Sequence, residues 1–214
     1  MSFKFDPSKI PFLIELMEKA IQDGREWGLD LLNESKHKHG RKKIAIHAIN
    51  MSTLWSIGKG IATGIAGLLA LPADLVDTVY SQVKLSATLF TIRGYDTANE
   101  GNWVFIVAAA IGISVHKLAK YLGVHAIKAL NKVLLPKSFR ILMKMNQTLA
   151  IKFGAKIFGK NVVKVAKAVP AIGGVIGGGV NGVTMLLCGR GVIRFMDDWG
   201  TGDDWEMEGG CAPA

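Results

Sequence analysis

No acidic residue occurs between Glu100 and Asp197, although lysine and arginine recur throughout that stretch. Such a long segment of one charge sign is unusual, because soluble domains normally mix both signs on their surface. A surface built from it is positive, so we expect an anionic partner, either a lipid surface or nucleic acid. Six of the 17 acidic residues instead cluster between Asp197 and Glu208.

The chain has only two cysteines and none of the common catalytic motifs. Cys188 and Cys211 lie in different sequence contexts, so we expect no disulfide framework and a reducing compartment. The chain contains no G-x-S-x-G elbow, no phosphate-binding G-x-x-x-x-G-K-[ST] loop, no H-E-x-x-H and no paired C-x-x-C. His37 and His39 lie in a basic run that repels cations, and the other histidines have no carboxylate or cysteine at ligand spacing. We therefore expect neither a metal nor another cofactor.

We also expect no export signal, because the first residues of the sequence do not match one. Asp6 and Glu15 stand where a signal peptide has a cationic start and then an uninterrupted apolar core. Together with the scarce cysteines, this predicts a cytoplasmic protein that is peripheral at the membrane.

Helical periodicity dominates the rest of the sequence. Hydrophobic residues make up 50% of the 214-residue chain, and they recur at three- and four-residue spacing while strand-like alternation never persists. The pattern predicts an all-α fold, a compact multi-helix bundle with Gly-rich core helices and Lys-rich amphipathic outer helices. No linker composition divides the chain, so we expect one helical domain over residues 1–196 and an acidic, disordered tail over 197–214.

Glycine and proline residues divide this pattern into separate helices. We expect an amphipathic helix from Pro11 to near Gly40, then two helices separated by Pro72, the second of which stops at Gly94. A short apolar helix from Trp103 to Val115 has about half the roughly 20 residues that a membrane span needs, which predicts a buried core helix.

Basic residues cluster in two places. The run from Lys36 to Lys43 lies at the expected exit of the first helix, where the macrodipole favours cations; binding of an anion is the alternative. Further along, lysines recur at every fourth residue and form one helical stripe. Like charges at this spacing repel, and an anionic surface would compensate for that repulsion. The residues that we assign to this anionic-surface site are Lys152, Lys156, Lys160, Lys164 and Lys167.

Glycines at helical spacing predict close helix packing in two segments. Ala168 to Cys188 carries no charge and, at roughly 20 residues, is long enough to span a bilayer, so a buried core helix and a membrane-inserting helix are both open. Asn181 and Pro170 within this segment favour the core. The glycines that we assign to helix packing are Gly60, Gly64, Gly173, Gly177, Gly178 and Gly182.

The best candidate for a polar site combines Asp74, Asp77, Arg93, Tyr95 and Asp96. Asp74 and Asp77 lie one turn apart on a helix, and the turn with Arg93 closes that helix at its other end, so contact between the two groups needs a bridging helix. Helix capping explains Asp74 and Asp96 without any site. The alternative is a hydrolase in which two carboxylates beside a tyrosine act as general acid and base.

Three short motifs carry a resemblance to a known family. They are residues 70–75 (ALPADL), residues 93–96 (RGYD) and residues 169–181, which run from VPAIGG to Asn181. They resemble the LPADL, YGYD and PxxGxxxGxxxN pattern of the EcsC family, over about residues 58–194, with arginine at 93 in place of tyrosine. The resemblance implies a mostly helical bacterial or phage protein of poorly defined activity, with no catalytic residues to carry over. The polar residues that match these motifs are Asp74, Arg93, Tyr95, Asp96 and Asn181.

These observations predict a non-catalytic protein that associates peripherally with anionic membranes through Lys-rich amphipathic helices. A stronger version inserts the Gly-rich helix into the bilayer. Two alternatives stay open, the hydrolase described above and non-specific nucleic-acid binding. The second fits the charge, but the chain has no recognised nucleic-acid module and few aromatic residues among the basic ones.

Overall fold

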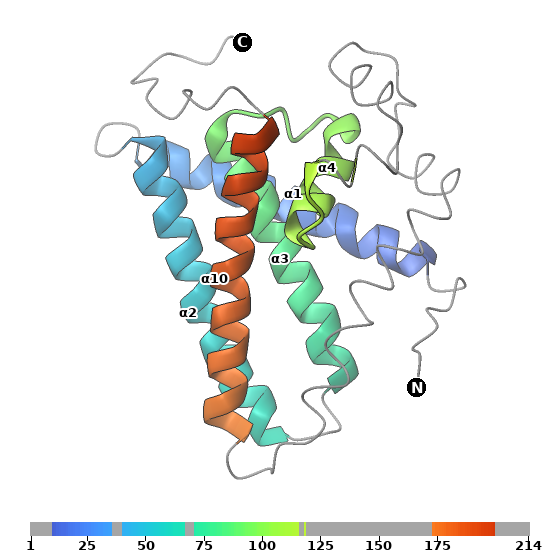
Figure 1. Ribbon diagram of the computed structural model, residues 1–214, viewed down its shortest axis with the longest axis vertical. Coiled ribbons are helices and arrows are strands. Elements are labelled where there is room, and N and C mark those ends of the chain that lie inside the picture. The colour runs from blue at the N-terminus through green and yellow to red at the C-terminus, as the bar shows by residue number, and fades with distance from the viewer. Residues whose placement is uncertain (1–9, 36–39, 67–70, 116–117, 119–172, 200–214) are drawn as a thin grey trace.

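The computed structural model describes residues 10–35, 40–66, 71–115, 118 and 173–199, and every regular element in these ranges is a helix. This confirms the predicted all-α fold for the described part of the chain. The Lys-rich helices predicted between 117 and 167 lie outside it. The elements, labelled as in Figure 1, are α1 (Ile10–Glu34), α2 (Arg41–Ala66), α3 (Leu71–Arg93), the 3-10 helix η3 (Glu100–Asn102), α4 (Trp103–Ala110) and α10 (Gly173–Trp199).

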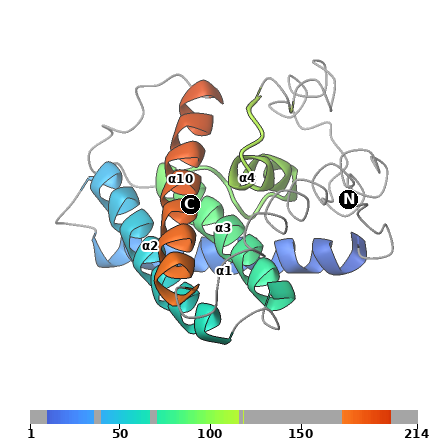
Figure 2. The same cartoon turned by 60° about the horizontal axis from the view of Figure 1, so that its bottom comes forward.

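Two helix pairs organise the bundle. Helices α2 and α10 run antiparallel and side by side, whereas α1 crosses α3 (Figure 1), and these are the two most extensive pairings in the described chain. The turned view in Figure 2 shows the same arrangement, with α4 beside α3. The start of α2 therefore lies at the same end of the bundle as the ends of α3 and α10.

The crossing of α1 and α3 depends on small residues of α1. Gly24 and Gly28 lie one turn apart, and both are buried against α3. A Cβ atom on Gly24 would lie only 2.3 Å from the carbonyl oxygen of Lys84, so any side chain at this position collides with the α3 backbone. The Thr88 hydroxyl also donates a hydrogen bond to the Gly24 carbonyl oxygen at 2.9 Å, which joins the two helices at this point.

The α2–α10 pair uses glycine in the same way. A Cβ atom on Gly182 would lie 2.5 Å from Cγ1 of Ile57, and one on Gly189 would lie 2.7 Å from Cγ1 of Ile49. Of the other glycines predicted for helix packing, two lie in α2 and three in α10, at the ends of these helices that are neighbours in Figure 1. They are Gly60, Gly64, Gly173, Gly177 and Gly178.

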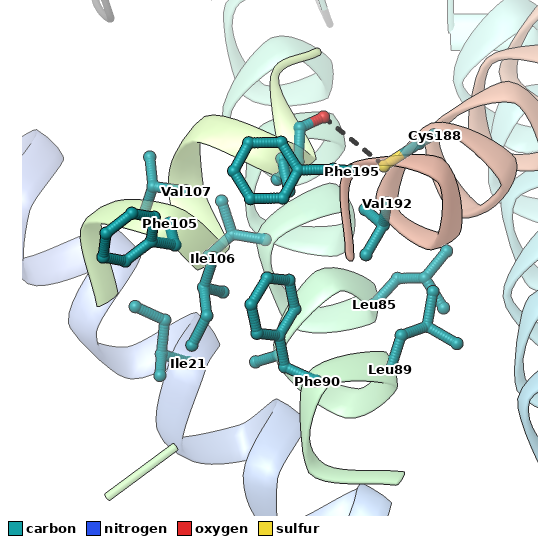
Figure 3. Packing of buried hydrophobic residues seen from close by; sticks show 14 of the residues in the cluster. Ile21, Leu85, Leu89, Phe90, Phe105, Ile106, Val107, Cys188, Val192 and Phe195 are labelled. Carbon is teal, nitrogen blue, oxygen red and sulfur yellow. Dashed lines mark hydrogen bonds between the residues drawn. The ribbon is translucent and has the colours of Figure 1, made fainter. Parts of the chain in front are cut away.

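The core is made where α4 fills the space beside α1, α3 and α10. Every residue of α4 is buried, as the sequence predicted, and the helix ends at Ala110 because Gly112 adopts a positive φ of 67°. Figure 3 shows Phe90 and Phe195 as neighbours within this core, with ring centroids 6.4 Å apart. The Cys188 thiol lies 3.4 Å from the Ala110 carbonyl oxygen, and burial raises the pKa of this thiol to about 12.

The residues from 173 to 188 belong to α10, which continues to Trp199. Among the helices that the structure describes, none combines the length and the hydropathy needed to cross a membrane.

The junction between α1 and α2 differs from the sequence-based prediction. Helix α1 ends at Glu34 and α2 begins at Arg41, so the last basic residues of the run lie in the first turn of α2 rather than at the exit of α1. The Gly40 carbonyl oxygen accepts the first backbone hydrogen bonds of α2, from Lys43 and Ile44. Arg41, Lys42 and Lys43 therefore stand at the positive end of a helix dipole, which disfavours them.

The end of α10 also differs from expectation. Asp197 and Asp198, assigned from sequence to the acidic tail, lie within α10. The Asp197 carboxylate pairs with the guanidinium of Arg93 at 2.5 Å, and the Arg93 side chain is only 3% exposed. Arg41 donates to the Arg93 carbonyl oxygen at 3.1 Å. The start of α2 and the ends of α3 and α10 are thus joined through Arg93.

Candidate functional site

The turn after α3, which carries the RGYD motif, is a helix C-cap. Gly94 adopts a positive φ of 98°, and its amide donates to the Thr91 carbonyl oxygen at 3.0 Å. The Tyr95 amide donates to the Phe90 carbonyl oxygen at 3.0 Å, and the ring centroids of Tyr95 and Phe90 lie 5.2 Å apart. This pair of hydrogen bonds with its apolar contact is the Schellman motif. The motif residues therefore end α3 and anchor the turn to the core.

Asp96 has a local structural role, which differs in detail from the predicted one. Its carboxylate accepts the Ala98 amide at 3.0 Å within the turn. The cap of η3 is instead Asn99, whose side chain accepts the Gly101 amide at 2.9 Å. The prediction that Asp96 caps the next helix was therefore wrong, since Asn102 is the N-cap residue of α4, the helix that begins at Trp103.

The two carboxylates at the start of α3 are far from this turn. Asp74 lies in the first turn of a helix that begins at Leu71, so it is inside the helix rather than a cap before it. Arg93 follows Asp77 by sixteen positions of continuous helix, which corresponds to about 24 Å at 1.5 Å per residue. The described part of the chain therefore holds the members of the predicted polar site at opposite ends of α3.

Asp77 and Asn181 instead meet in a small polar cleft between α2, α3 and α10. The Asp77 carboxylate accepts two hydrogen bonds from Lys59, at 2.8 and 3.0 Å. The cleft encloses about 10 Å³, the space of one water molecule, which excludes a substrate. No cluster of His, Cys, Asp or Glu suited to a metal ion occurs among the described residues. The side chains around the cleft are those of Ser56, Lys59, Asp77, Thr78, Ser81, Asn181, Thr184 and Met185.

A much larger cavity opens next to this cleft, between α1, α2 and α3. Its volume is about 750 Å³, within the range of small-molecule sites. Leu85 and Met185 line it and are almost completely buried, whereas Leu54 and Trp55 line it and are 64% and 67% exposed. The cavity thus has a buried floor and an open, apolar rim. Its other lining residues are Trp27, Met51, Ser52, Ser56, Gly58, Lys59, Tyr80, Ser81 and Lys84.

Two lysines lie over tryptophan rings in this cavity. The Lys59 ammonium is 5.8 Å from the centroid of Trp55, and the Lys84 ammonium is 5.8 Å from that of Trp27. Both distances suit cation–π attraction. The two lysines differ in their charge environment, since Lys59 is paired with Asp77 and Lys84 forms no ion pair in the described part of the chain.

Tyr80 completes the wall of the cavity between α1 and α3. Its hydroxyl donates a hydrogen bond to the carboxylate of Asp23 on α1. Burial raises the pKa of Tyr80 above its usual value, and the hydrogen bond to Asp23 raises it further. The carboxylate of Asp23 therefore faces a neutral donor, and within the described residues it forms no ion pair with Lys84.

The raised pKa of Tyr80 predicts a loss of stability in alkali. Because the folded-state pKa exceeds the unfolded value of about 10, Tyr80 contributes stability that is fully present below about pH 10 and decreases above it. We expect the free energy of unfolding, measured with urea, to fall more steeply above about pH 10 in the wild type than in Tyr80→Phe. Tyr95→Phe is the control variant, which should keep the steeper pH profile of the wild type. Equal pH profiles for wild type and Tyr80→Phe would contradict the prediction.

Sequence reasoning missed this cavity. A local signal exists for Trp55 and Lys59, which are four residues apart and therefore neighbours on one helix face. No sequence pattern links Trp27 to Lys84, because only the crossing of α1 over α3 brings them together. The predicted lysine stripe, from Lys152 to Lys167, lies outside the described residues.

Comparison of the chain with protein-family models, curated proteins and solved structures finds no match. The resemblance to the EcsC family stays a prediction.

Proposed function

We propose that the protein associates peripherally with anionic membranes and that the α2–α10 pair takes part in the contact. The observation that carries the proposal is a group of large apolar side chains, exposed on these two neighbouring helices. The contact of Gly182 with Ile57 and Thr53 puts the exposed residues of both helices at a similar level along the pair. This apolar set comprises Leu54, Trp55, Val183 and Leu187, which are between 57% and 67% exposed.

Exposed basic residues accompany the apolar set toward one end of the pair. Lys42 and Lys43 lie in the first turn of α2, where the helix dipole disfavours them, so an anionic surface would relieve an unfavourable interaction. Each lysine or arginine near an anionic membrane contributes about 1 kcal/mol, and tryptophan is favoured at the membrane interface. The basic set comprises Lys42, Lys43, Arg190 and Arg194, all exposed.

The lysine stripe predicted from sequence is the second element of the proposal. Lys152, Lys156, Lys160, Lys164 and Lys167 would add positive charge to the same protein, and reversible binding needs only several such contacts together with some apolar insertion. Changing the four stripe lysines that repeat every fourth residue to glutamine tests this element separately from the α2–α10 pair.

Co-sedimentation with vesicles tests the proposal. We expect binding to vesicles that contain phosphatidylglycerol, little binding to phosphatidylcholine alone, and weaker binding at high salt. Leu54→Ser with Trp55→Ser should reduce binding, whereas Phe12→Ser removes a similarly exposed apolar side chain on α1 and should not. Lys42→Gln with Lys43→Gln should also reduce it, with Lys19→Gln and Arg25→Gln on α1 as the charge-matched control. Absence of binding to anionic vesicles would refute the proposal.

The two alternatives from the sequence receive less support. A hydrolase that combines Asp74 and Asp77 with Tyr95 and Asp96 would need to bring together two groups that α3 holds at opposite ends. Nucleic acid would suit the basic set, but three of the four side chains of the apolar set are aliphatic and offer no stacking surface to a base, and Trp55 is its single aromatic residue. A gel shift that weakens steeply with salt would favour nucleic acid over lipid.

A further inference from the structure

We infer that the cavity between α1, α2 and α3 binds one anionic amphiphile with a single acyl chain. The inference rests on the proposed function for the source of this molecule, the membrane, and extends it from surface contact to the binding of a defined ligand. Residues from four helices line the cavity, since Met185 of α10 contributes to its lining as well.

The walls of the cavity select an apolar tail. Trp27 and Tyr80 lie on opposite helices, and the floor is formed by Leu85 and Met185, which are 0% and 2% exposed. The polar side-chain groups of its lining are serine and tyrosine hydroxyls, the ring N–H groups of two tryptophans and two lysine ammonium groups. Burial of methylene groups against such a surface is favourable, so a flexible hydrocarbon chain suits this space better than a polar metabolite does.

The charges around the cavity select the head group. Lys59 is neutralised by the Asp77 carboxylate at 2.8 Å, whereas Lys84 forms no ion pair in the described chain and is held over Trp27. Asp23, the acceptor of the Tyr80 hydrogen bond, does not line the cavity. One cationic group thus lacks an anionic partner among the described residues of a mostly apolar cavity, and the complementary ligand carries one carboxylate or phosphate on an apolar chain.

The rim connects this cavity with the proposed membrane contact. Leu54 and Trp55 belong to the apolar set and also line the cavity. If the membrane contact places Leu54 and Trp55 in the outer part of a bilayer, the mouth of the cavity lies next to the lipid. An amphiphile could then move from the bilayer into the cavity without crossing water.

Calorimetric titration of the full chain with monomeric sodium dodecanoate tests the inference in the absence of any membrane. We expect saturable binding of one molecule per chain, about fourfold weaker for each methylene removed, so that decanoate binds about fifteenfold more weakly. Dodecan-1-ol, which has the same chain without the charge, should bind at least about tenfold more weakly. Failure of dodecanoate to bind, or equal binding of the alcohol, would overturn the inference.

Three variants locate the site. Lys84→Gln should weaken dodecanoate binding about tenfold by removing the partner of the carboxylate. Ser52→Phe should abolish binding by filling the cavity from a partly exposed position, and circular dichroism checks that its helices are intact. Lys43→Gln, on α2 but not part of the cavity, should leave it unchanged. Wild-type affinity in both Lys84→Gln and Ser52→Phe would place any dodecanoate site elsewhere.

The same variants separate this inference from the proposed function. Lys42→Gln with Lys43→Gln should weaken vesicle binding and leave dodecanoate binding unchanged. Lys84→Gln should weaken dodecanoate binding and leave vesicle binding unchanged. Vesicle binding without dodecanoate binding would refute the cavity ligand alone. Dodecanoate binding without vesicle binding would refute the membrane contact alone.

Discussion

Replacing Gly24 by alanine is expected to lower the free energy of unfolding by about 2–3 kcal/mol, the upper part of the range for overpacked cores, and the melting temperature by about 5–10 °C. The added Cβ would lie 2.3 Å from the Lys84 carbonyl oxygen and 2.8 Å from Ala87 Cβ. A backbone atom cannot move aside as the end of a side chain can. The whole of α1 must shift, which also breaks the hydrogen bond from Thr88 to the Gly24 carbonyl oxygen.

The matched control for this change is Gly191→Ala in α10. A Cβ atom on Gly191 meets nothing within 4 Å, so alanine there should stabilise the helix by up to about 1 kcal/mol through its higher propensity. Urea denaturation of both variants gives the comparison. If Gly24→Ala were as stable as Gly191→Ala, the close crossing of α1 and α3 would be wrong.

Asp197→Ala is expected to lower the free energy of unfolding by about 2–3 kcal/mol, because it leaves the charge of Arg93 buried without its carboxylate. The Arg93 side chain is 3% exposed, whereas that of Asp197 is 44% exposed. Exposure of the carboxylate reduces the loss below that for a fully buried pair. The pair also joins the ends of α3 and α10, so its loss should loosen both helix ends.

The neighbouring residue supplies the control for this prediction. Asp198→Ala removes the same charge from the next position of α10, where the side chain is exposed and forms no ion pair in the described chain. We expect a change within about 0.5 kcal/mol, as for most surface substitutions. Equal losses in the two variants would show that net charge at the end of α10, rather than the contact with Arg93, is responsible.

The motif residues that suggested a polar site have structural roles in the described chain. Arg93 is paired within the bundle, Gly94 and Tyr95 end α3, and Asp96 accepts a hydrogen bond in the following turn. Polar residues in a short motif can therefore be present because they stabilise the end of a helix. The candidate site lies elsewhere, in the cavity whose aromatic and basic residues come from separate helices.

The proposed membrane contact and the inferred ligand binding would involve different lysines and arginines of the protein. The basic set lies on the α2–α10 pair and is exposed to solvent, where its charges act at a distance and are screened by salt. Lys84 lines a cavity and is partly buried, where its charge acts on a single bound group. This difference is the reason that salt should affect vesicle binding more than dodecanoate binding.

The sequence by itself determined the properties that depend on local patterns. Helical periodicity specified the all-α class of the described part of the chain, Gly94 specified the end of α3, and the apolar run after Trp103 specified a buried helix. These features depend on residues within a few turns of one another, so spacing alone reveals them. The long segment without acidic residues likewise specifies a strongly basic chain, because net charge depends on composition and not on how the helices pack.

Only the tertiary structure decided which distant residues meet. Nothing local predicts that Gly24 contacts Lys84, that Arg93 pairs with Asp197, or that Trp27, Trp55 and Tyr80 surround one cavity. The helical period shows which side of a helix is apolar, but not which helix covers that side or at what angle it crosses. Contacts between α1, α2, α3 and α10 set those choices, and with them the position of the candidate site.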